Sequence, residues 1–227
     1  MCKRLLFLLL FFPALLFAQD ADDYEIYITS SNRYASLFRG ELLPSYERKK
    51  PLDGSTYFAY SENFEAGSLL FRGKRYDGVI LNLDAHLDEL YIAYPAFSVF
   101  LTVNKSFVDE FSINKHSFVH HRPEAPSLLI PGYYQVLHTG KVKLYKKVQK
   151  MADFEASTLI VRGYRLKEVF YLCKDDVWYR VNSKQRVLNL FPEHKQAINR
   201  YLKGNQITFR ASFEIALMST IDFWESL

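Results

Sequence analysis

Residues 68–83 have the sequence SLLFRGKRYDGVILNL, and this stretch decides the fold class. Two runs rich in apolar side chains flank Gly73 and Lys74. Glycine reaches positive φ without steric cost, and two residues suffice to join antiparallel strands. We therefore predict a β-hairpin with Gly73-Lys74 as its turn. Asp77-Gly78 interrupts the return strand, which predicts a β-bulge or a bend there.

The same pattern continues along most of the chain. Segments with many aromatic and β-branched residues recur about every 8–12 residues and are separated by turn signals, which favours strands. Lys174-Asp175-Asp176 is predicted to form the last tight turn. We expect a mainly β (α+β) protein in which residues 19–182 form an antiparallel meander, folded as a half-barrel or a sandwich. Besides the hairpin, the expected strands are residues 24–28, 55–60, 89–94, 97–103, 107–113, 117–121, 133–137, 142–148, 159–161, 168–173 and 177–181.

Residues 183–227 carry helix signals instead. Ser183 and Ser212 each precede a segment with helical spacing and are suitable N-caps. Pro192 suits the first turn of a helix, and Gly204 suits a helix end. We predict about three short helices. Helices of this length are marginal in water, so the segment should pack against the β domain.

Residues 1–18 have the features of a secretory signal peptide. Lys3 and Arg4 precede an apolar run at residues 5–17, and Ala18 ends it. The run is shorter than the roughly 20 residues that a membrane-spanning helix needs. We predict cleavage near Ala18-Gln19, a periplasmic or extracellular location, and no transmembrane segment in the mature protein.

Charge, cysteine content and aromatic content limit the ligands that the protein could bind and indicate how its fold is stabilised. The formal net charge is only +4 at pH 7, which predicts no general attraction to nucleic acid. Signal cleavage would leave Cys173 as the one thiol, so an apolar core rather than a disulfide must stabilise the fold. Aromatic residues make up 16% of the chain. They fit a large core, or a concave apolar face that holds a lipid-like ligand.

Asp84, His86 and Asp88 are the first candidate site. They alternate along the chain, so in an extended segment their side chains share one face. Two carboxylates and an imidazole could bind a divalent metal ion or act as acid and base. The alternative is that they line a solvated hairpin tip, where Asp and His are common.

A basic run is the second candidate. It consists of Lys141, Lys143, Lys146, Lys147 and Lys150, interleaved with apolar residues. Such a run could form a surface patch for anionic lipid headgroups or an acidic partner, at about 1 kcal/mol per basic residue near a charged surface. The alternative is a solvated strand face whose lysines discourage edge-to-edge pairing.

Common catalytic motifs are missing from the sequence. It contains no Gly-x-Ser-x-Gly, no His-Glu-x-x-His and no glycine-rich phosphate loop. Cys173 has no histidine near it in the sequence that could activate it. We therefore assign no catalytic residue and no cofactor, and we favour a function without enzymatic activity over an enzymatic one.

Several short stretches resemble a group of uncharacterised exported β-rich proteins of Gram-negative bacteria that have a helical C-terminal tail. The matching pieces are residues 54–57, 67–76, 79–83 and 90–92, followed by 178–181, Ser183, Leu188, Phe191-Pro192, 197–198 and 207–209. The resemblance implies a β-rich exported fold with a helical tail. It brings no activity, ligand or catalytic residue.

The sequence thus leads to three functional hypotheses. The first is an envelope protein that binds a partner protein or an apolar, lipid-like ligand without catalysis. The second is a metal-assisted hydrolase that uses Asp84, His86 and Asp88. The third is a structural scaffold component of the envelope.

Overall fold

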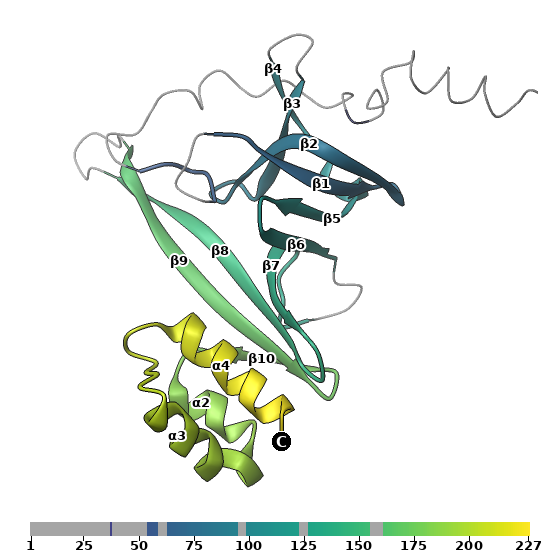
Figure 1. The fold of residues 1–227 in the computed structure, drawn as a ribbon. Coiled ribbons are helices and arrows are strands. Elements are labelled where there is room, and N and C mark those ends of the chain that lie inside the picture. The colour runs from purple at the N-terminus through teal and green to yellow at the C-terminus, as the bar shows by residue number, and fades with distance from the viewer. Residues whose placement is uncertain (1–36, 38–53, 59–62, 95–98, 123–126, 155–160) are drawn as a thin grey trace, which may run out of the picture. The chain divides into compact units, whose positions relative to one another are not determined.

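The computed structural model describes residues 37, 54–58, 63–94, 99–122, 127–154 and 161–227 (Figure 1). They belong to one compact unit that runs from Leu37 to Leu227. The predicted signal peptide (1–18) and the expected strand at residues 24–28 lie outside the described residues.

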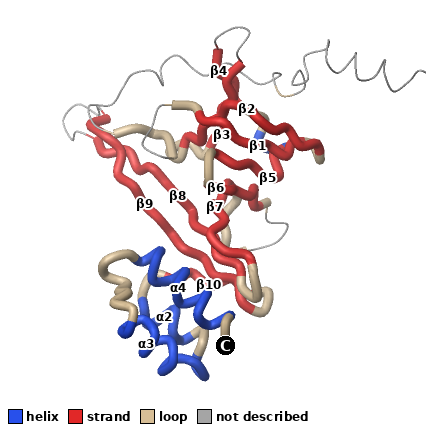
Figure 2. Tube along the Cα trace, viewed as in Figure 1, coloured by secondary structure: helices blue, strands red, loops and turns tan. Residues whose placement is uncertain are grey.

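The described part is mainly β, with three C-terminal α-helices, which confirms the predicted fold class (Figures 1 and 2). Ten strands form one antiparallel sheet in the order β10-β9-β8-β7-β6-β5-β1-β2-β3-β4. The sheet is open, and β4 and β10 are its edges. The strands are β1 (Glu65–Phe71), β2 (Lys74–Asp84), β3 (Glu89–Tyr94), β4 (Val99–Thr102), β5 (Val108–Ile113), β6 (His116–His121), β7 (Gly132–Thr139), β8 (Lys143–Phe154), β9 (Val161–Lys174) and β10 (Val177–Val181).

The connectivity differs from a single meander at one point. β1 to β4 are consecutive neighbours, and so are β5 to β10, but β5 pairs with β1 instead of β4. A 3-10 turn, η3 (Lys105–Phe107), leads the chain back across the first four strands. Gly67 permits this pairing, because a Cβ built on it would lie only 1.8 Å from the Ser112 carbonyl oxygen.

The β1–β2 hairpin forms with its turn one residue earlier than predicted. Its central residues are Arg72 and Gly73, whose φ angles of 53° and 71° suit a two-residue turn. The predicted bulge is confirmed. Gly67 pairs with Val79 and Ser68 pairs with Asp77, which leaves Gly78 as the extra residue, with a φ of 71°.

Two other strand predictions change. Residues 54–58 contribute a single bridge, between Tyr57 and Asp84, in place of the expected strand at 55–60, whose last two residues are not described. The expected strands at 159–161 and 168–173 are both replaced by the longer β9, of which residues 159–160 are not described. β9 pairs with β8 from Val161 to Cys173 apart from an irregularity at Arg162, so main-chain pairing continues through residues 163–168, where apolar alternation is weak.

The helical segment begins and ends largely where the sequence predicts. α2 (Lys184–Asn189), η4 (Pro192–His194), α3 (Lys195–Gly204) and α4 (Phe213–Glu225) follow β10. The Ser183 hydroxyl accepts a hydrogen bond from the Arg186 amide (3.4 Å), and the Ser212 hydroxyl accepts one from the Ile215 amide (3.3 Å). Both predicted N-caps are confirmed.

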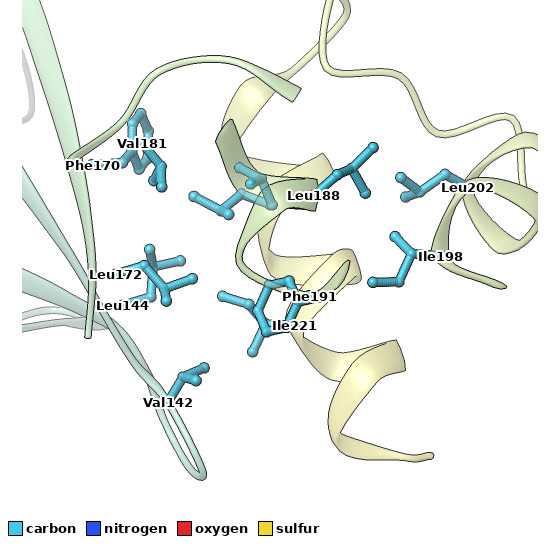
Figure 3. Packing of buried hydrophobic residues seen from close by; sticks show 12 residues of the cluster. Val142, Leu144, Phe170, Leu172, Val181, Leu188, Phe191, Ile198, Leu202 and Ile221 are labelled. Carbon is cyan, nitrogen blue, oxygen red and sulfur yellow. The ribbon is translucent and has the colours of Figure 1, made fainter. Parts of the chain in front are cut away.

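The helices bury their apolar side chains against the β8–β10 end of the sheet (Figure 3). Leu144 and Leu172 on the sheet face Phe191 and Ile221, and none of the four is more than 1% exposed. A fully buried side chain of this size contributes about 1.5–3 kcal/mol. This core therefore holds the helical segment on the sheet, as expected for helices too short to be stable alone.

The sheet also curls, so that the β2–β3 turn meets β8. The Lys150 amide donates a hydrogen bond to the Ala85 carbonyl (3.0 Å), although β2 and β8 are separated by several strands in the sheet order. The part of the chain that the structure describes contains no helix with the length and apolarity needed to cross a membrane.

Candidate binding groove at the free edge of the sheet

Asp84, His86 and Asp88 do not come together as a metal centre. The Asp84 carboxylate is buried and closes the β2–β3 turn, where Oδ1 accepts hydrogen bonds from the amides of His86 and Leu87 (both 2.8 Å). The His86 Nδ1 lies 2.8 Å from the Lys150 carbonyl oxygen. Among the described residues, no group of three His, Cys, Asp or Glu side chains could hold a metal ion.

Asp88 instead forms an ionic connection between distant strands. Its Oδ1 lies 2.5 Å from the Lys147 Nζ, and its Oδ2 lies 2.6 Å from the Lys105 Nζ. The Tyr133 amide also points at this carboxylate, at 3.3 Å. Asp88 therefore joins the β2–β3 turn to η3, β7 and β8, which is a structural role.

The basic run is not a surface patch either. Lys146, Lys147 and Lys150 are 7%, 4% and 1% exposed, and only Lys141 and Lys143 are exposed to solvent. The prediction of a five-lysine anionic-surface patch is wrong, because the sequence shows alternation but not what packs against the strand.

Each buried lysine has oxygen partners from another part of the chain. Lys146 Nζ lies 2.7 Å from Glu214 on α4, and Lys150 Nζ donates to the Ser55 carbonyl (3.0 Å). Burial lowers the pKa of Lys150 to about 8 and also lowers that of Lys147, although Asp88 opposes the second shift. These lysines stabilise the contact between β8 and its neighbours and are not available to a ligand.

A different site lies at the free edge formed by β10. Asp175 and Asp176 have φ angles of 51° and 59°, which confirms the predicted tight turn and gives it type I′ geometry. Lys174 then pairs with Val177, and pairing continues to Val181 with Phe170. Residues of an antiparallel strand alternate in the direction of their main-chain hydrogen bonds.

This register determines which main-chain groups face outward. The residues paired to β9 by hydrogen bonds are 177, 179 and 181, so the N–H and C=O groups of Trp178 and Arg180 point away from β9. Among the residues that the structure describes, no strand lies beyond β10 in the sheet. Within the described ranges, these groups have no main-chain partner on that side.

A groove follows this edge. It has a volume of about 390 Å³ and is bounded by the segment after Ser127 on one side and by α2 on the other. Its lining residues are Leu128, Trp178, Tyr179, Arg180, Val181, Arg186, Asn189 and Leu190. Two of these are arginines and none is acidic, so the groove has a positive local charge.

Apolar side chains are unusually exposed around the groove. Leu128 is 49% exposed and Tyr179 is 38% exposed within it, and the adjacent Val177 is 50% exposed. Trp178 is held in place by Tyr145, with ring centroids 4.8 Å apart. Scattered exposed apolar residues are normal, but several beside one groove mark an interaction surface.

A second hollow, of about 370 Å³, lies on the face of the sheet over β1, β5, β6 and β7. Two of its serine hydroxyls already bond within the protein, since those of Ser68 and Ser112 are 2.9 Å apart and Arg75 Nη2 donates to Ser68 (3.0 Å). The edge groove is the better candidate binding site, because the outward main-chain groups of β10 have no main-chain partner in the described part of the chain.

The edge groove was not predicted from the sequence. Residues 177–181 (VWYRV) predict a strand, and that prediction is confirmed, but nothing in them says which side stays unpaired. The signal in the sequence that could have indicated this groove is the run of aromatic and apolar residues just before a helix N-cap.

Comparisons of the chain with protein-family models, with curated proteins and with solved structures found no match.

Proposed function

We propose that this protein is a non-enzymatic binding protein of the cell envelope, and that a segment of a partner protein docks in the groove between β10 and α2. One observation carries the proposal: exposed apolar side chains and free main-chain groups lie together at an open sheet edge. The envelope location is supported by the signal-peptide features of residues 1–18.

A partner protein fits this groove better than a lipid-like ligand does. A polypeptide can satisfy the main-chain N–H and C=O groups of Trp178 and Arg180, whereas an acyl chain would leave them without partners. An unpaired buried polar group costs about 1–3 kcal/mol. Arg180 and Arg186 would also lose hydration against an acyl chain without gaining a counter-charge.

Site-specific photo-crosslinking in the periplasm tests the proposal. A benzoylphenylalanine replaces Tyr179 in the groove, and the matched control replaces Leu166, which is similarly exposed (40% against 38%) but lies on β9. We expect a crosslinked protein with the first variant and not with the second.

The captured protein is then identified, purified and titrated against the wild type and against Tyr179→Lys and Leu166→Lys variants. We expect at least tenfold weaker binding for Tyr179→Lys and less than a twofold change for Leu166→Lys. Equal crosslinking at both positions, or equal affinity of both variants, would overturn the proposal. A copurified lipid in native mass spectrometry whose loss follows Tyr179→Lys would overturn it in favour of the lipid-like ligand.

A further inference from the structure

We infer that the groove holds its occupant as an added β-strand, and that this occupant is an acidic, extended segment of the partner protein. The inference rests on the proposed function and specifies its chemistry. Strand addition to a free sheet edge gives affinity through main-chain hydrogen bonds and gives specificity through alternate side chains.

The main chain of β10 provides the first requirement. The N–H and C=O groups of Trp178 and Arg180 point towards the groove, spaced as in any antiparallel or parallel ladder. An extended segment laid beside them becomes the next strand of the sheet. A helical segment has its own main-chain groups paired and could not use these donors and acceptors.

The charge of the groove determines the side chains of the occupant. Arg180 extends from β10 and Arg186 from α2, both are exposed, and no acidic residue lines the groove. A guanidinium presents paired N–H donors that match a carboxylate, so Asp or Glu side chains are favoured and Lys or Arg are repelled.

Apolar contacts complete the pattern. Successive side chains of an added strand point to opposite sides. One side of the groove presents Leu128 with Trp178 and Arg180, which share a face of β10, and the other presents Arg186 on α2 and Leu190 directly after it. Both sides therefore combine apolar and basic groups, so the occupant should carry apolar and acidic residues.

A second copy of this chain is a poorer occupant. Pairing of two β10 edges would bring Arg180 and Arg186 of both copies into one small region, and like charges in close register destabilise strand pairing. An acidic segment of another protein would instead place carboxylates beside Arg180 and Arg186, so no like charges would meet.

Synthetic peptides test the inference on the purified protein. The probe is a fluorescein-labelled nine-residue peptide of alternating Val and Asp with blocked ends, and binding is followed by fluorescence anisotropy. Three comparison peptides are measured in the same way. One is a Val–Lys peptide, the second is the Val–Asp peptide N-methylated on its central Val residues, and the third is the Val–Asp peptide N-methylated on its central Asp residues. In an added strand, the N–H groups that face β10 belong to every second residue.

We expect the Val–Asp peptide to bind at least tenfold more tightly than the Val–Lys peptide. One N-methylated peptide, but not the other, should lose at least tenfold in affinity. Arg186→Gln should weaken Val–Asp binding at least fivefold, while Arg200→Gln, an exposed arginine on α3, should leave it within twofold.

The remaining outcomes overturn the inference. Equal tolerance of both N-methylations would exclude strand addition, and equal binding of the Val–Lys peptide would exclude the acidic occupant. Failure of all four peptides to bind would overturn both parts. A doubled mass in sedimentation that Tyr179→Lys abolishes would identify a second copy as the occupant. The Tyr179 crosslinking result stands apart from these outcomes and decides the proposed function by itself.

Discussion

Replacement of Asp88 by asparagine should destabilise the protein by about 2–3 kcal/mol, although Asp88 lies in a turn. Its carboxylate is 2.5 Å from the Lys147 ammonium and 2.6 Å from that of Lys105. The Lys147 side chain is only 5% exposed, so loss of the carboxylate leaves a buried charge without its counter-charge. Asparagine tolerates the φ of 59° found at this position, so the substitution isolates the charge from the backbone.

The magnitude follows from the burial of the two partners. Removal of one member of a fully buried ion pair costs about 3–5 kcal/mol. The Asp88 side chain is 23% exposed and the new amide still accepts a hydrogen bond, which reduces the cost. Lys147→Met removes the buried charge itself and should cost less than about 1.5 kcal/mol. The double variant should therefore be more stable than the sum of the two single effects predicts.

Urea unfolding followed by tryptophan fluorescence measures these differences. The matched control is Asp77→Asn, because Asp77 also pairs with a basic residue, Arg75, but its side chain is 72% exposed. Exposed pairs contribute little, so the control should change the free energy of unfolding by less than about 0.5 kcal/mol. If Asp88→Asn changes the free energy of unfolding no more than Asp77→Asn does, or if the effects of Asp88→Asn and Lys147→Met simply add, the buried pair does not stabilise the protein as proposed.

Two further predictions concern Lys150 and Gly67. Burial lowers the pKa of Lys150 to about 8 from an ordinary value of 10.5, so between these values the unfolded chain binds more protons and stability rises with pH. The stability of the wild type relative to Lys150→Met should accordingly increase from pH 8 to about pH 10 in urea titrations, and a flat difference would contradict this. Gly67→Ala places a Cβ 1.8 Å from the Ser112 carbonyl oxygen and should cost at least about 2 kcal/mol, whereas Gly204→Ala meets open space and should stay within about 1 kcal/mol of the wild type. Similar unfolding midpoints for the two glycine variants would show that β1 and β5 can separate without cost.

The fate of the basic run could not be predicted from the sequence, because a residue pattern does not show which distant segments pack against it. The basic run begins with lysines that alternate with apolar residues at 141–144, as on a solvated strand, and Lys146 and Lys147 follow shortly after. Their partners Glu214 and Asp88 lie 68 and 59 positions away along the chain. Only the curl of the sheet and the placement of α4 convert this basic run into buried ion pairs.

The residue pattern predicted the β1–β2 hairpin, the Gly78 bulge and the caps at Ser183 and Ser212. Each depends on backbone preferences and hydrogen bonds within a few positions, so local residue types suffice. The tertiary structure alone decided that β5 returns to β1, that three lysines are buried, and that β10 has a free edge. These features depend on which distant segments meet. That choice is made by the packing of the whole core, since main-chain hydrogen bonds are the same for every pair of strands.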